Sequence, residues 1–77
     1  MTQPVYSIRD MLIEFHAPIV GINDEQMKRD FKVFCDKKAD IEKADLQLYK
    51  IGEFDTKTGM IIPQEPEYIM GGFENGN

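Results

Sequence analysis

The sequence predicts a single α+β domain in which one helix packs on a small antiparallel sheet. Three observations support this class: a β-prone segment at 4–9, an amphipathic segment at 24–37, and two β-prone runs, 46–54 and 60–62, separated by turn residues. Their order is strand, helix, hairpin. An apolar helix stripe that covers one face of the sheet satisfies the usual two-layer arrangement.

The first strand is expected at 4–9, PVYSIR, which partly alternates and carries β-prone side chains. The next stretch, 10–22, is ambiguous because its apolar residues fit either a continued strand or a helical turn. Pro18 and Gly21 interrupt whatever precedes them. We expect this stretch to be a long apolar connection that packs on the core.

A helix is predicted from about 24 to 37. Asn23 suits the N-cap, and Gln26 stands at the third helical position of a capping box. The apolar residues that follow recur at helical spacing and form one stripe: Met27, Phe31, Phe34 and Cys35.

The clearest local pattern is a β-hairpin in the stretch "LYKIGEFDTKTGMII", residues 48–62. Asp55 can accept hydrogen bonds from the backbone ahead of it, and Gly59 can adopt the positive φ that closes such a turn. The polar stretch before it, 39–45, is expected to be a connection or a short helical turn.

The segment after Pro63 contains acids, a further proline and paired glycines, so we expect it to be a tail. Residues 1–70 are expected to form the domain and 71–77 a flexible tail. The residues of this segment that we expect to dock are Tyr68, Ile69 and Met70.

The length of 77 residues predicts that the chain self-associates, as a dimer or larger. A core of this size usually gives only about 3–5 kcal/mol, and the single cysteine cannot form an internal disulfide. The sequence has no signal-peptide pattern and no apolar run long enough to span a membrane. We therefore expect a protein of the cytosol, with no membrane partner.

Catalysis, cofactor binding and metal binding are not expected. His16 is the only histidine, and Cys35, its one possible nucleophilic partner, lies on the apolar helix stripe. The sequence contains no phosphate-binding glycine loop, calcium loop or zinc-protease motif. Most carboxylates are expected to be solvated surface groups.

The net charge of -5 disfavours nucleic-acid binding by bulk electrostatics, so any such role depends on local clusters. Lys28, Arg29 and Lys32 are neighbours on the predicted helix, beside its apolar stripe. They fit either phosphate contact or an ordinary solvated face that also holds acids.

Aromatic residues on the predicted strands provide a second signal. Tyr6 lies near Arg9, and Tyr49 precedes Lys50. A strand aromatic near a cation is the combination that stacks unpaired bases on a sheet. Alternation places Tyr49 on the face opposite Leu48, which permits this use.

Three segments, "YSIRD", "NDEQMKRDF" and "LYKIGEFDTKTGMI", together resemble the small non-structural protein of gokushoviruses, which are single-stranded DNA phages of the microvirus family. The resemblance covers about residues 5–70, and the hairpin is its most specific part. It implies a non-enzymatic protein of the host cell cytoplasm. Such a protein binds single-stranded DNA during the switch to single-strand genome synthesis and packaging.

The candidate DNA contacts come from the residues themselves, because the resemblance supplies none. The alternative is a protein–protein adaptor that contacts viral or host replication or assembly factors without touching DNA. The candidates are Arg9, Lys28, Arg29, Lys32 and Lys50 for phosphates, with Tyr6 or Tyr49 for base stacking.

Overall fold

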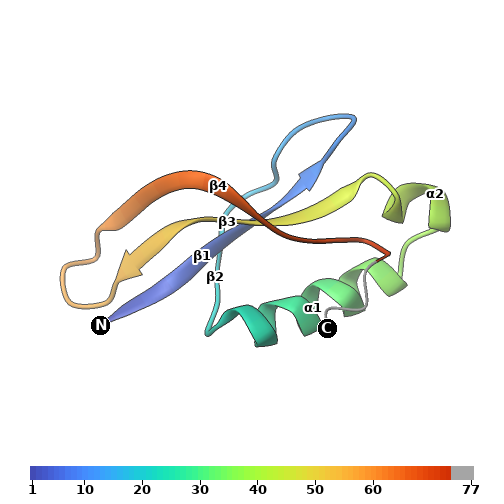
Figure 1. Cartoon of the computed structure of the whole chain (residues 1–77). Helices are drawn as coiled ribbons and strands as arrows, with labels where there is room; N and C mark the ends of the chain where they lie inside the picture. The colour runs from blue at the N-terminus through green and yellow to red at the C-terminus, as the bar shows by residue number, and fades with distance from the viewer. Residues whose placement is uncertain (74–77) are drawn as a thin grey trace.

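The computed structural model describes residues 1–73, which form an antiparallel sheet of four strands with one long helix against one side (Figure 1). The order across the sheet is β2-β1-β3-β4. The predicted α+β class is confirmed. The elements are β1 (Thr2–Asp10), β2 (Ile19–Val20), α1 (Asp24–Asp36), α2 (Asp40–Lys43), β3 (Leu46–Asp55) and β4 (Ile61–Gly71).

The ambiguous stretch 10–22 contains a turn and a fourth strand, so the expectation of three strands was wrong. The Asp10 carboxylate accepts from the Leu12 amide at 3.0 Å, and the chain then returns along β1. The two residues of β2 pair antiparallel with Val5 and Tyr6 of β1. A strand of two residues depends on β1 for its hydrogen bonds. Its own sequence is too short to predict a strand.

The strand β4 runs from Ile61 to Gly71, well past the end at 62 predicted for the hairpin. Pro63 and Pro66 suggested a tail, but prolines are tolerated on an edge strand, and β4 is an edge of this sheet. The first two residues of the expected tail, 71–77, lie beside β3: Gly71 ends β4 and pairs with Gln47, and the Gly72 amide donates to the Leu46 carbonyl at 3.0 Å. Residues 74–77 of that tail lie outside the described residues.

The helix α1 begins as predicted. The Asn23 side chain accepts from the Gln26 amide at 2.8 Å, which caps the helix. The Gln26 side chain donates to Asp30 at 3.1 Å instead of returning to the cap. The expected connection at 39–45 contains the short helix α2.

The turn between β3 and β4 also follows the prediction. The Asp55 carboxylate accepts from the Lys57 amide at 2.8 Å, and the Gly59 amide donates to the Asp55 carbonyl at 2.8 Å. Gly59 has φ of 77°, in the left-handed region that favours glycine.

The core lies between α1 and one side of the sheet, which we call the helix side. Neighbours paired across the strands share a face, and β1, β3 and β4 contribute Ile8, Leu48 and Met70 in one such row. The other side, which α1 does not cover, we call the open face (Figure 1). The buried core residues on the helix side are Tyr6, Ile8, Met27, Phe31, Cys35, Leu46, Leu48 and Met70.

The sheet extends beyond α1. The molecule is 40 Å long, whereas the 13 residues of α1 span about 20 Å. The hairpin end of the sheet therefore projects past the start of α1 (Figure 1).

Candidate nucleic-acid interface

Three aromatic rings lie side by side on the open face, and we call them the aromatic row: Phe15, Tyr49 and Tyr68. The Phe15 and Tyr49 centroids are 5.4 Å apart, and the Tyr49 and Tyr68 centroids are 5.8 Å apart, both edge to face. Tyr49 pairs with Tyr68 across β3 and β4, and it lies on the face opposite Leu48, as alternation predicted. The row therefore crosses β4 and β3 at one level, and Phe15 continues it beyond β1 at the level of Arg9, two residues along that strand.

The outer rings of the row are accessible. Phe15 is 39% exposed and Tyr68 is 47% exposed. The central Tyr49 is half-buried, and its hydroxyl donates to the Gln47 side chain at 2.9 Å. The row thus offers two ring surfaces around a central ring with a fixed position.

Arg9 lies at one end of the row. Its guanidinium carbon is 5.6 Å from the Phe15 ring centroid, a cation–π contact. The backbone holds Phe15 there through an antiparallel bridge to Arg9, and the Ser7 hydroxyl donates to the His16 carbonyl at 2.7 Å. Arg9 and Phe15 thus combine a cation with an exposed ring, as a stacking site for nucleotides requires.

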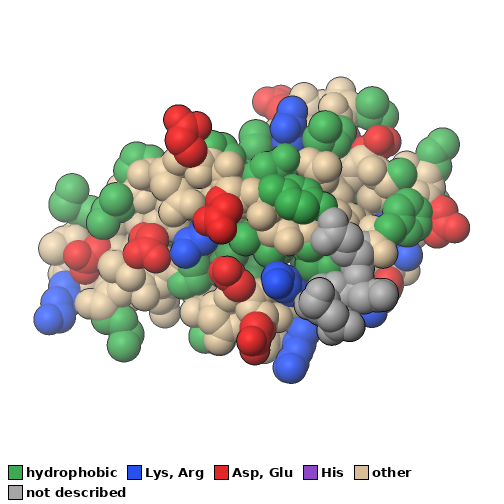
Figure 2. Space-filling view, viewed as in Figure 1, with side chains coloured by type: hydrophobic (Ala, Val, Ile, Leu, Met, Phe, Trp, Pro, Cys, Tyr) green, Lys and Arg blue, Asp and Glu red, His purple; other side chains and the backbone are tan. Residues whose placement is uncertain are grey.

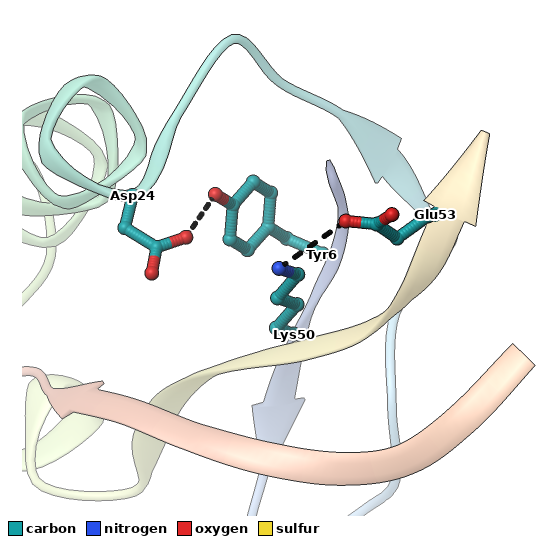
Figure 3. Close-up of polar contacts among 4 residues, drawn as sticks. All are labelled: Tyr6, Asp24, Lys50 and Glu53. Carbon is teal, nitrogen blue, oxygen red and sulfur yellow. Dashed lines mark hydrogen bonds and ion pairs between the residues drawn. The ribbon is translucent and has the colours of Figure 1, made fainter. Parts of the chain in front are cut away.

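Tyr6, a sequence candidate for stacking, is fully buried on the helix side at 0% exposure. Its hydroxyl donates to the Asp24 carboxylate in the first turn of α1 (Figure 3). The ring has no surface to offer a base, so we correct that expectation. Alternation along β1 accounts for this result: Tyr6 is two residues from Ile8, which pairs with Leu48 on the helix side, and the register shift lies beyond Tyr6, toward Val5.

Lys50 also lies away from the aromatic row. It pairs with Tyr6 across the sheet, and its ammonium is 3.6 Å from the Glu53 carboxylate (Figure 3). Glu67 is its partner on β4, and Lys50 lines a shallow depression together with Asp24, Glu25 and Glu53. These carboxylates make its surroundings unfavourable for a phosphate.

The remaining candidate cations, Lys28, Arg29 and Lys32, lie on α1, on the side of the sheet away from the row. Lys28 is half-buried, and Arg29 and Lys32 are exposed. Acidic and basic side chains are interspersed on the surface seen in Figure 2, with no large area of one sign. The structure therefore divides the sequence candidates into three groups: Arg9 and Tyr49 on the open face, Lys28, Arg29, Lys32 and Lys50 on the helix side, and Tyr6 in the core.

Two members of the aromatic row were missed by the sequence reasoning. Phe15 lies in the stretch left ambiguous, and Tyr68 was expected only to dock as part of a tail. Treating 61–71 as a strand would have included Tyr68, but plain alternation would have placed it on the face of the core residue Met70, two positions away, because only the bulge at Ile69 puts the two on opposite faces. Phe15 has no comparable local signal.

Two further observations concern metal binding and membrane spanning by residues 1–73. They contain no cluster of three or more His, Cys, Asp or Glu side chains suited to a metal ion. None of the helices in this range has the length and apolar character needed to cross a membrane.

Fold and surface together define a small α+β domain of one long helix and one sheet, with an aromatic row on the face that the helix leaves open. The chain belongs to the phage ORF5 protein family, whose model matches residues 3–75. It is thus a phage protein, as the sequence resemblance implied, and its assignment to gokushoviruses remains a prediction. No curated protein and no solved structure gives a significant match.

Proposed function

We propose that this phage protein binds single-stranded DNA without catalysis, through the aromatic row and Arg9 on the open face. The observation that carries the proposal is the placement of two exposed rings and a cation on one uncovered sheet face. Unpaired bases stack on such rings whatever their sequence, at about 1–3 kcal/mol per base. In the host cytoplasm, the protein would cover the genome strand during the switch to single-strand synthesis and packaging.

The dimensions of the site suit a short length of strand. Phe15 and Tyr68 flank Tyr49, so each protomer offers about two stacking surfaces. Arg9 lies beside Phe15 and can contact the phosphate next to a base stacked on that ring. Binding by one protomer is therefore expected to be weak and tolerant of sequence.

The test is a titration of a fluorescein-labelled oligo-dT of ~20 nucleotides at ~50 mM salt, followed by anisotropy. Tyr68→Ala should weaken binding about fivefold or more, because one stacking surface is lost. Phe73→Ala is the matched control, since Phe73 is 61% exposed, follows the end of β4 and lies beside Lys43 of α2. It should leave the affinity unchanged.

A second comparison separates the two sides of the molecule. The triple variant Lys28→Ala, Arg29→Ala, Lys32→Ala should bind as the wild type does if the open face is the site. If this variant lost DNA binding while Tyr68→Ala kept the wild-type affinity, the DNA-binding site would lie on α1 instead. Absence of any DNA binding by the wild type would leave the adaptor hypothesis in its place.

A further inference from the structure

The paired positions of the open face are almost free of charge. Apart from Arg9, the residues that the ladder places on it are uncharged, although the chain carries a net charge of -5. The register arranges these uncharged residues in successive rows: Gln3, Phe54 and Ile61; Val20, Val5, Gly52 and Pro63; Ser7, Tyr49 and Tyr68; then Phe15 and Gln47 beside Arg9.

Several apolar side chains of this face are well exposed. Ile61 is 57% exposed and Val20 is 47% exposed, in addition to the outer rings of the aromatic row. An antiparallel sheet with one solvated face normally places polar residues there. An apolar face of this extent is typical of a surface that another molecule covers.

The sheet edges do not suit pairing between subunits. Pro63 and Pro66 remove amide donors from β4, and Glu65 and Glu67 add charge to it. The other edge, β2, has only two residues. Self-association through a sheet face is therefore favoured over pairing of sheet edges.

Charge and area both fit a second copy of this chain as the occupant. Two chains of net charge -5 repel, so their contact is least costly where acids are fewest, as at the paired positions of the open face. Three long strands about 4.8 Å apart and about 30 Å long, with the two residues of β2 beside them, give a projected area of about 450 Å². That is more than half of the standard interface of about 800 Å² of accessible surface per partner, and side chains that stand out from the sheet add to it.

We propose that a second copy of this chain covers the open face when DNA is absent, so that self-association and DNA binding compete for one surface. Two sheets related by a two-fold axis would pack about 10 Å apart, with the helices outside. The self-association rests on the surface alone, whereas the competition also rests on the proposed DNA-binding function.

The experiment is sedimentation velocity of the full chain over a range of concentrations, alone and with excess oligo-dT. Ile61→Gln should weaken the dimer about tenfold, because it places an amide in an apolar interface. Ile62→Gln is the matched control: Ile62 is 51% exposed but pairs with Glu53 on the helix side. It should leave the dimer unchanged.

Oligo-dT should convert the wild-type dimer into DNA-bound monomers, and Ile61→Gln should bind DNA more tightly at high protein concentration, because no dimer competes. A wild-type monomer at all concentrations, or equal weakening by both variants, would overturn the self-association. Oligo-dT bound to an intact dimer would overturn the competition and leave the proposed function standing. A stable dimer that binds no DNA would refute the proposed function, and the competition with it, while supporting the self-association.

Discussion

The Tyr6 hydroxyl, in the middle of β1, donates a hydrogen bond to the Asp24 carboxylate in the first turn of α1 (Figure 3). This contact joins the sheet to the start of the helix across 18 residues of sequence. Burial of the ring and the neighbouring carboxylate raise the pKa of Tyr6 above its usual range. The packing of α1 on the sheet therefore depends in part on the Tyr6 hydroxyl keeping its proton.

Tyr6→Phe should lower the free energy of unfolding by about 1–2 kcal/mol. The substitution keeps the buried ring but removes the donor from a partly buried carboxylate, and the loss of a hydrogen bond to a charged group has about this cost. Urea unfolding at neutral pH, followed by circular dichroism, measures the difference. Equal stability of the two proteins would show that solvent replaces the contact without cost.

The same pair predicts a loss of stability at alkaline pH. A tyrosine in the unfolded chain loses its proton near pH 10, whereas the raised pKa keeps the folded phenol protonated. The unfolded state then binds fewer protons, so this group's contribution is complete below about pH 10 and falls by up to ~1.4 kcal/mol per pH unit above it. Urea unfolding from about pH 8 to 11 should show this slope in the wild type. Tyr6→Phe should lack it, and parallel slopes in the two proteins would contradict the assignment.

Two glycines should respond differently to alanine because their constraints differ. A Cβ on Gly52 would lie 2.5 Å from the Ile62 carbonyl oxygen of the adjacent strand, so the backbone must move. A Cβ on Gly59 meets nothing within 4 Å, and only its φ of 77° opposes the substitution. We expect Gly52→Ala to cost about 2–4 kcal/mol and Gly59→Ala about 1 kcal/mol. Thermal unfolding of both variants measures this, and a reversed order would show that β3 and β4 are less tightly joined at Gly52.

The parts predicted well from the sequence are those with strong local signals. The N-cap at Asn23 and the turn from Asp55 to Gly59 depend on residues within a few positions of each other. Such local signals can be recognised without knowledge of the tertiary fold. The strand β2 and most of β4 were missed because their strand conformation depends on pairing with β1 and β3. In β4, Pro63 and Pro66 also weaken the sequence signal for a strand.

The candidate site was only half predictable for a related reason. Tyr49 was placed correctly, because the alternation from Leu48 still holds where β3 and β4 shift register. Tyr6 was placed wrongly as a stacking residue, because the sequence does not show that α1 covers the face of β1 on which Tyr6 lies. Charge gave little guidance, since the cations of α1 and Arg9 lie on opposite sides of the sheet. The face of the sheet on which each side chain lies is set by the pairing register, which a single sequence does not encode locally.

The salt dependence of DNA binding should be shallow. The open face provides one cation per protomer, Arg9, and each phosphate neutralised on a single strand contributes a slope of about -0.7 in log affinity against log salt concentration. We expect a slope near that value for the wild type and near zero for Arg9→Gln. Anisotropy titrations between about 50 and 200 mM salt give the slope. A slope near -2 would indicate three phosphate contacts and favour Lys28, Arg29 and Lys32.

Cys35 provides a direct probe of how firmly α1 packs on the sheet. Its thiol is 0% exposed on the buried stripe of the helix, and burial raises the pKa of Cys35. Reaction with Ellman's reagent therefore requires α1 to open, and if opening costs about 3 kcal/mol or more, labelling should be about a hundredfold slower than in urea. The double variant Cys35→Ala, Val33→Cys is the control, because Val33 lies on the same helix and is 56% exposed. Its thiol should react at once in the native protein. Equally fast labelling of wild-type Cys35 would mean that α1 leaves the sheet readily, and that the core it covers contributes little to the folded state.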